Sequence, residues 1–436
     1  MVSEGIKAMQ SYWNEVKEIE KIQRGMYIIL PLKYAADVKL DDISVLNCKP
    51  IEFSSDDFIE LLIEKCSVSG DFVRRFRMNP DELQISLPDL EKNGISVTDL
   101  QMFIFTGGIA FLTVYLSYCN RDVSSVYDFI LPGYTSEEKK IKEAQMHFLK
   151  ELEEKLIHRV VSEMDWFITD ESYKPFLLKE AYRMNTAGLP KRFDETEAVN
   201  RITYNEHRII ELSRDFADSS EKDVAYVTGA RDVDLCNYGW GCAITSQEIS
   251  YAYANGGKSP IERAQDDLLL TMLVMYQKYT CMHLNEEIHQ RYVSQGKKAN
   301  REKSIRDLKH EAMIFIAYGT LAPSQISRWN NVCETYRLLI ELNGINEAIE
   351  EIKEKINLLD EEQERIDSQR ESTVGMIIAV FGLISIVAAV LQIIDYVSTG
   401  RMEMLVSFAT SLGCILLFGI ILLIMLLRRK KRNGDV

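Results

Sequence analysis

Five polar residues stand inside or beside apolar sequence near the C-terminal end of the chain: Ser385, Gln392, Tyr396, Thr399 and Glu403. Ser385, Gln392 and Thr399 follow one another at intervals of seven residues, so a helix that persists this far places them on nearly one face. Their oxygens can face a hydrated cation, whereas such groups are costly to leave in lipid. The spacing predicts that Ser385, Gln392 and Thr399 either line a water-filled path or pack against another helix, and Gln392 is the better candidate for a pore. For Ser385 alone, a hydrogen bond to its own helix backbone is the simpler explanation.

Upstream, a cation, an amide and two aromatic rings occur close together in Arg231, Asn237, Tyr238 and Trp240, with a glycine on either side of the tryptophan. Rings that stack on a base and a guanidinium that contacts phosphate predict a nucleotide-binding site. No glycine-rich phosphate-binding signature accompanies them. A plain turn that leads into a helix, with 245–248 as its capping box, explains the same residues.

Metal and catalytic chemistry have weaker signals. His283, Glu286, Glu287 and His289 share adjacent turns of one predicted helix, but the two histidines diverge by about 120° around it. We expect structural roles for all four, and the identity of any bound metal is unknown. The eight cysteines contain no CxxC pair, which is typical of reduced thiols. Sequence spacing pairs no nucleophile with a base, so we do not expect an enzyme.

Two uncharged apolar runs, 374–394 and 404–427, close the chain, and only 395–403 separates them. Each run is long enough as a helix to cross a bilayer, so the pair predicts a transmembrane hairpin with 395–403 as its outer loop. The basic tail, 428–436, marks the cytoplasmic side. We therefore expect a multi-pass protein of the inner (plasma) membrane with both termini in the cytoplasm.

Residues 1–258 predict a cytoplasmic α/β domain with a soft boundary near 190, because β-type runs alternate with helical patterns. The clearest element is a hairpin whose strands, 102–105 and 109–118, flank a Thr-Gly-Gly turn. Further predicted strands are 26–32 and 83–87, predicted helices are 1–24, 55–66, 136–164 and 195–216, and 186–192 is a predicted loop. The net charge of −15 argues against direct nucleic-acid binding.

From 242 onward the chain is predicted to be almost wholly helical, and 259–373 is a helical region that ends in a stalk. Ser259 and Pro260 start one helix as its cap and first residue. Another helix covers 303–318, and one long helix is predicted from 324 to 394.

The long helix carries a seam of apolar residues at steps of three and four along 338–391, which is typical of a heptad repeat. Self-association around an axis would bury this seam, and packing against the helix that starts at Pro260 is the alternative. Eleven carboxylates against four bases in 341–371 would concentrate cations at a pore mouth, although Glu/Lys pairing on a solvated face explains most of them.

The order of segments over 260–432, with a stalk entering the first of two spans, a short outer loop and a basic tail, resembles the CorA family of divalent-cation transporters. That family has Tyr-Gly-Met-Asn at the outer end of its first span. Here Tyr396 precedes Val397, Ser398 and Thr399, and Glu403 matches an acidic residue of the family's outer loop. The resemblance implies a homo-oligomer, a pentamer in this family, surrounded by lipid, with divalent cations such as Mg²⁺ as its cargo.

Because it lacks Gly-Met-Asn at this position, the chain resembles CorA-like membrane effectors associated with type III CRISPR systems. Those effectors are similar to the transporters and respond to a nucleotide messenger. This second resemblance implies antiviral defence and an adenine-nucleotide ligand. Three functions follow as expectations: a cation channel or transporter gated by its cytoplasmic domain, such an effector, or a non-conducting membrane-anchored sensor or scaffold.

Overall fold

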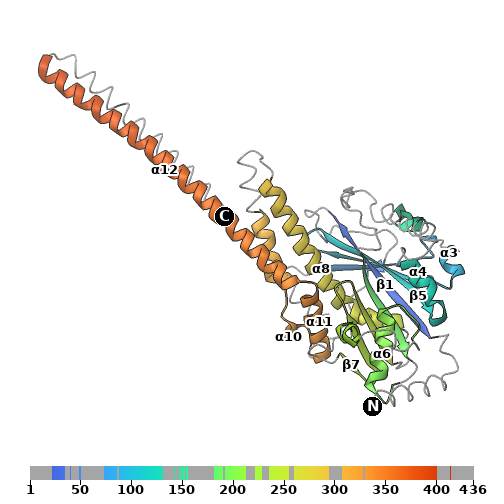
Figure 1. Ribbon diagram of the computed structural model, residues 1–436. Helices are drawn as coiled ribbons and strands as arrows, with labels where there is room; N and C mark the ends of the chain where they lie inside the picture. Colours follow the sequence, from blue (N-terminus) through green and yellow to red (C-terminus); the bar gives the residue numbers. More distant parts are fainter. Residues whose placement is uncertain are drawn as a thin grey trace. The chain divides into compact units, whose positions relative to one another are not determined.

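The computed structural model describes residues 22–34, 40, 49–50, 73–85, 88–130, 143, 147–148, 150–152, 154–155, 181–189, 192–212, 221–227, 235–254, 260–293, 307–327, 329–399 and 413. The chain divides into two compact units, Met1–Lys355 and Ile356–Val436. The first unit contains a sheet and the helices that cover it (Figure 1). The second is described by itself below.

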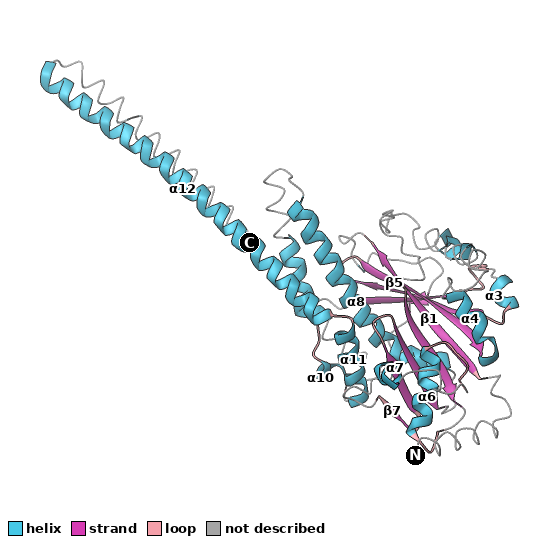
Figure 2. Ribbon diagram, viewed as in Figure 1, coloured by secondary structure: helices cyan, strands magenta, loops and turns pink. Residues whose placement is uncertain are grey.

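Nine strands among the described residues form one sheet, in the order β2-β3-β4-β5-β1-β6-β9-β8-β7 (Figure 2). The strands are β1 (Gln23–Lys33), β2 (Lys49–Pro50), β3 (Val73–Met78), β4 (Ser96–Phe105), β5 (Ile109–Cys119), β6 (Tyr182–Leu189), β7 (Cys236–Asn237), β8 (Trp240–Ile244) and β9 (Glu248–Ala254). Neighbouring strands are antiparallel except β6 and β9, which are parallel. The sheet thus runs without division through residue 190.

The predicted hairpin is confirmed as β4 and β5. Gly107 and Gly108 both have positive φ, +86° and +85°, which glycine adopts without steric cost, so the turn closes tightly. The predicted strand 26–32 is also confirmed and extends to all of β1. Both successes come from long apolar runs bounded by turn residues.

Helices cover both faces of the sheet. The helices among the described residues are α3 (Pro88–Lys92), α4 (Val123–Ile130), α6 (Thr196–His207), α7 (Glu221–Val227), α8 (Pro260–Val293), α10 (Pro323–Ile326), α11 (Asn330–Leu342) and α12 (Ile345–Thr399), of which α4 and α8 pack on opposite faces. The main core gathers alternate residues of the central strands, including Met26, Ile28, Leu30, Leu112 and Val114, and covers them with Val123 and Val126 of α4. On the opposite face α8 packs through stacked Phe105 and Tyr276, whose ring centroids are 4.7 Å apart. The predicted start of α8 at Pro260 is confirmed.

Three local predictions are wrong. The predicted loop 186–192 contains the second half of β6, because pairing with β1 and β9 outweighs the turn preference of its glycine. In the predicted strand 83–87, Leu83 and Gln84 belong to a turn, Ile85 is not in a strand, and 86–87 lie outside the described residues. The chain after 242 is not wholly helical: β8 and β9 form a hairpin, and 245–248 connects them instead of capping a helix.

The other helix predictions have mixed outcomes. The helix predicted over 195–216 is real but ends at His207. The one predicted over 303–318 is confirmed from 307 onward, and its last turn is a π-helix, η5 (Phe315–Gly319). The helix predicted over 1–24 is wrong at its end, because Gln23 and Arg24 belong to β1, and its first 21 residues lie outside the described part. The predictions for 55–66, most of 136–164, 404–427 except Gly413, and 428–436 also lie outside the described residues.

The prediction of one helix from 324 to 394 is wrong. α10, α11 and α12 are separate helices, and Asn343 and Gly344 form the link between the last two. Gly344 has φ +62°, a left-handed conformation that ends a helix. The heptad steps continue across this link, which is why the apolar pattern does not reveal it.

The start of α12 belongs to the first unit. Ile345, Ile349 and Ile352 are buried there, and Lys355 donates to Asn285 of α8 at 2.9 Å. In these first turns of α12 the apolar seam is therefore buried within the chain. This agrees with the alternative prediction, in which the seam packs inside one chain instead of between copies.

The second unit contains the rest of α12. Within it lies the only described helix that is long and apolar enough, by length and composition, to cross a membrane: Glu371–Ile394. None of this apolar segment is buried. The helix continues to Thr399, so 395–399 is helical and cannot belong to an outer loop.

Candidate functional site

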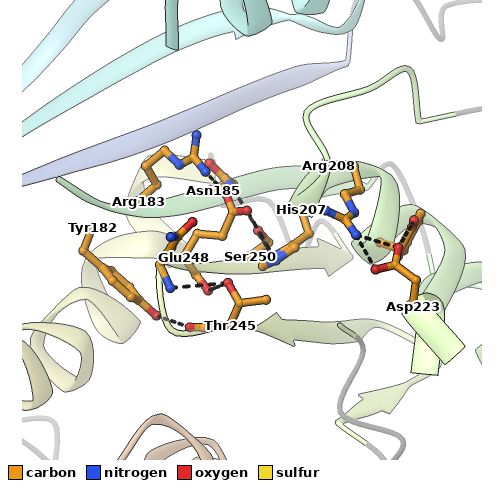
Figure 3. Close-up of polar contacts among 11 residues, drawn as sticks. Tyr182, Arg183, Asn185, His207, Arg208, Asp223, Thr245, Glu248 and Ser250 are labelled. Atoms are coloured by element: carbon orange, nitrogen blue, oxygen red, sulfur yellow. Dashed lines mark hydrogen bonds and ion pairs between the residues drawn. The ribbon is translucent and has the colours of Figure 1, made fainter. Parts of the chain in front are cut away.

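Three consecutive ionisable residues, Glu206, His207 and Arg208, lie at the C-terminal end of α6, and each contacts a different element of the first unit. Figure 3 shows the contacts of His207 and Arg208. We call these three residues and their polar partners the α6 junction. The partners are Arg24, Asn120, Arg183, Asn185, Asp223, Glu248 and Ser250. The helix ends here because Ile209 adopts φ +54°, a strained conformation for a β-branched residue, and Ile209 is buried.

Glu206 faces β1. Its carboxylate lies 2.6 Å from Nε of Arg24, and both side chains are wholly buried. Arg24 also donates to the Asn120 side chain at 3.0 Å and to the Ile210 carbonyl at 2.7 Å. Burial raises the pKa of Glu206, and the nearby guanidinium opposes that rise. A buried ion pair with further hydrogen bonds is costly to break by removing one partner.

His207 faces β6 and β9. Its Nδ1 lies 3.0 Å from the Ser250 hydroxyl, and its Nε2 lies 3.5 Å from the Glu248 carboxylate. That carboxylate accepts from Arg183 at 3.0 Å, and Asn185 donates to the Ser250 hydroxyl at 2.9 Å. Burial lowers the pKa of His207 to about 4, with Glu248 acting in the opposite direction. The imidazole is therefore neutral at physiological pH.

Arg208 faces α7. Its guanidinium donates to the Asp223 carboxylate at 2.6 Å, and Tyr204, one helical turn earlier, donates to the same carboxylate at 2.7 Å. This pair is partly exposed, unlike the contacts of its two neighbours. The end of α6 thus holds β1, β9 and α7 through three adjacent side chains.

The residue types Ser250, His207 and Glu248 are those of a hydrolase triad, but their arrangement does not suit nucleophilic catalysis. Ser250 is wholly buried, His207 is 1% exposed, and Asn185 already donates to the serine oxygen. A nucleophile needs room for a substrate carbonyl about 3 Å away, with donors for the oxyanion. The α6 junction therefore acts as a cross-link between strands and helix.

The predicted nucleotide residues lie at the tip of the β7–β8 hairpin, except Arg231, which is outside the described residues. Asn237 ends β7 and its side chain accepts from the Gly239 amide at 2.8 Å, which shapes the turn. Tyr238 is 56% exposed. Trp240 begins β8 and its ring faces Tyr251 at 6.2 Å, so it belongs to the sheet.

The structure adds a cation that the sequence pattern did not suggest. Arg192 lies across Gly239: a Cβ built on this glycine would be 3.1 Å from Cγ of Arg192. The backbone joins the same loops, because Phe193 donates to the Tyr238 carbonyl at 2.8 Å. Arg192 is thus a described cation beside Gly239, the residue that follows Tyr238, whereas Arg231 lies outside the described residues.

The residues considered for a metal are engaged elsewhere. His283 lies 3.8 Å from Glu311, and Glu286 accepts from Lys33 at 2.9 Å. Within the described parts of the chain, no three His, Cys, Asp or Glu residues are grouped to hold a metal ion.

The predicted pore residues belong to α12 or follow it. Ser385 is exposed and Gln392 is half-buried within the second unit. Tyr396 and Thr399 lie in the last turns of α12, where the backbone alone is described, and Glu403 lies outside the described residues. Because α12 is helical as far as Thr399, Ser385, Gln392 and Thr399 lie on nearly one face of it.

Comparison of the chain with protein-family models, curated proteins and solved structures found no match. The resemblance in segment order therefore rests on the sequence alone. The function of the chain has to be argued from its own residues.

Proposed function

We propose that this chain forms a homo-oligomeric cation channel or transporter of the inner membrane, organised like the CorA family and gated by its cytoplasmic α/β unit. In this proposal the first apolar segment of each copy lines the pore, and the second run, 404–427, surrounds it. Both termini face the cytoplasm.

One observation carries the proposal. α12 is a single helix whose start is packed into the first unit and whose later part, Glu371–Ile394, is an apolar segment with none of its surface buried. Leaving such a surface in water would cost about 25 cal/mol per Å² of apolar area. Lipid and further copies of the helix together can cover it on all sides.

Polar residues favour a pore over a dry anchor. Ser385, Gln392 and Thr399 repeat on one face of an otherwise apolar helix, and an amide in lipid needs a partner or water. The carboxylates of 341–371 add negative charge before the apolar segment. Ion pairs neutralise some of these carboxylates: Lys353 pairs with Glu350 at 2.6 Å, and Arg337 pairs with Glu341 at 3.2 Å.

The test is ion flux in liposomes that contain the purified full-length protein. Cation flux that falls when Gln392 is replaced by leucine, and persists when its apolar neighbour Ile393 is replaced by leucine, supports a pore along this face. A non-conducting sensor or scaffold would pass no ions in either form. Absence of flux under all ionic and ligand conditions would refute the channel.

A second candidate, the nucleotide-gated effector, is favoured by the exposed Tyr238 beside Arg192. The aromatic face of Tyr238 at the hairpin tip and the guanidinium of Arg192, which approaches Gly239 from the segment before α6, suit stacking on a base and contact with phosphate. Calorimetry with adenine nucleotides tests this candidate, and Tyr238→Ala should weaken any binding at least about tenfold. Equal binding by that variant would exclude the hairpin tip as the site.

A further inference from the structure

The link between α11 and α12 is a defined break. Asn343 caps α11, with its side-chain amide donating to the Leu339 carbonyl at 2.8 Å. Gly344 follows at φ +62°, and its amide donates to the Glu341 carbonyl at 3.0 Å. The next residue, Ile345, already belongs to α12. Two residues therefore absorb the whole change of direction between the helices.

One ammonium group holds this link from the side of α8. Lys278 donates to the Asn343 side-chain oxygen at 2.9 Å and approaches the Ser246 carbonyl at 3.5 Å. Burial lowers the pKa of Lys278, and no carboxylate among the described residues pairs with it. A cation at the end of α11 is instead favoured by the unpaired carbonyls and dipole of that helix end.

The neighbouring residue of α8 fixes the other side of α11. Gln277 donates to the Gly319 carbonyl at 2.8 Å and to the Tyr336 hydroxyl at 2.9 Å. Two turns further along α8, Asn285 accepts from Lys355 of α12 at 2.9 Å. One face of α8 thus contacts η5, α11 and the start of α12 through uncharged oxygens and amides.

The contacts differ in what they restrain. Gln277 and Tyr336 are wholly buried and hold α11 itself. Lys278 contacts the hinge residue and is only partly buried. Lys278 therefore supplies the hydrogen bond from α8 to Asn343, whose own amide stays bonded to Leu339 of α11. Loss of this bond would leave the start of α12 held by its buried isoleucines and by Lys355.

We propose that Asn343 and Gly344 form a hinge and that Lys278 latches it, holding the start of α12 against α8. Opening the latch releases the first turns of α12 while α11 stays in place. That this release gates ion flow rests on the proposed function, whereas the latch itself does not.

Hydrogen–deuterium exchange on the full-length protein in detergent tests the latch without ions. Lys278→Met keeps the apolar stem and removes the ammonium, so amide exchange over 343–352 should rise about tenfold, as expected for one lost hydrogen bond to a charged group. Asn343→Ala removes the oxygen to which Lys278 donates and should likewise raise exchange in the same segment. Lys353→Met removes an exposed cation of α12 and is the matched control, expected to leave exchange unchanged.

Faster exchange confined to the start of α12 in Lys278→Met, with α8 and α11 unchanged, supports the latch. If that variant loses protection throughout the first unit, Asn343→Ala decides alone. Exchange that changes by less than about twofold in both variants overturns the proposal. Ion flux in liposomes separates the two proposals. If hydrogen exchange supports the latch but no ions pass, only the channel is refuted. If ions pass but exchange does not support the latch, only the hinge is refuted.

Discussion

Acidification should weaken the first unit through His207. The folded protein holds this imidazole at a pKa of about 4 because it is buried, whereas the unfolded chain has the ordinary value of 6.5. The unfolded state therefore binds the proton first, so the contribution of His207 to stability is complete above pH 6.5 and is lost as pH falls toward 4. Between pH 7 and pH 4.5 the difference corresponds to about 2 kcal/mol.

The assay is hydrogen exchange of the α6 and β9 amides in the full-length protein, converted to opening free energies after correction for intrinsic rates at each pH. The His207→Asn side chain cannot take up this proton. Between pH 7 and pH 4.5 the opening free energy of the variant should therefore fall by about 2 kcal/mol less than that of the unaltered protein. His289→Asn, at an exposed position of α8, is the control and should follow the unaltered protein. Parallel pH curves for His207→Asn and the unaltered protein would refute the assignment of this effect to His207.

Two further predictions concern β1, and thermal unfolding followed by circular dichroism measures both. Arg24→Met should destabilise the first unit by about 3–5 kcal/mol, because Glu206 would stay buried without its ion-pair partner and would have to take up a proton. The double variant Arg24→Met/Glu206→Leu should recover most of that loss, and an equally unstable double variant would contradict the ion-pair explanation. Gly25→Ala should cost about 1–3 kcal/mol, because a Cβ there would overlap the Tyr115 ring. An unchanged midpoint would show that this ring moves away freely.

The sequence was sufficient where one local pattern dominated. The β4–β5 hairpin and β1 have long apolar runs, and the start of α8 has proline at its first position, so their secondary structure follows from nearby residues. β6, β8 and β9 were missed because their stretches are short, polar or rich in turn residues. Their strand conformation depends on partners far along the chain, such as the pairing of Arg24 with Ala187 across β1 and β6.

The break at Asn343 shows a different failure. Asparagine followed by glycine is a recognisable helix end, but the apolar steps on either side of it keep a heptad register. A prediction based on apolar periodicity alone therefore treats α11 and α12 as one helix. The cap residues were the correct signal.

The α6 junction could not be predicted from spacing. Arg24 lies in an apolar strand, and Glu206 and His207 lie at the end of a helix with charged residues throughout. Burial of these groups depends on a contact between residues almost two hundred positions apart. A charged residue inside an otherwise apolar strand was the one available hint, because such a residue needs a partner.

The position of β1 has a consequence for the order of events during synthesis. This first described strand is hydrogen-bonded on both edges, and one of its neighbours, β6, ends only at Leu189. The nascent chain must therefore keep an apolar segment unpaired on one side until that neighbour leaves the ribosome, a period in which chaperones could bind it. All nine strands precede residue 255, whereas the apolar part of α12 begins at Glu371. The sheet can thus be complete before the segment proposed to enter the bilayer has been translated.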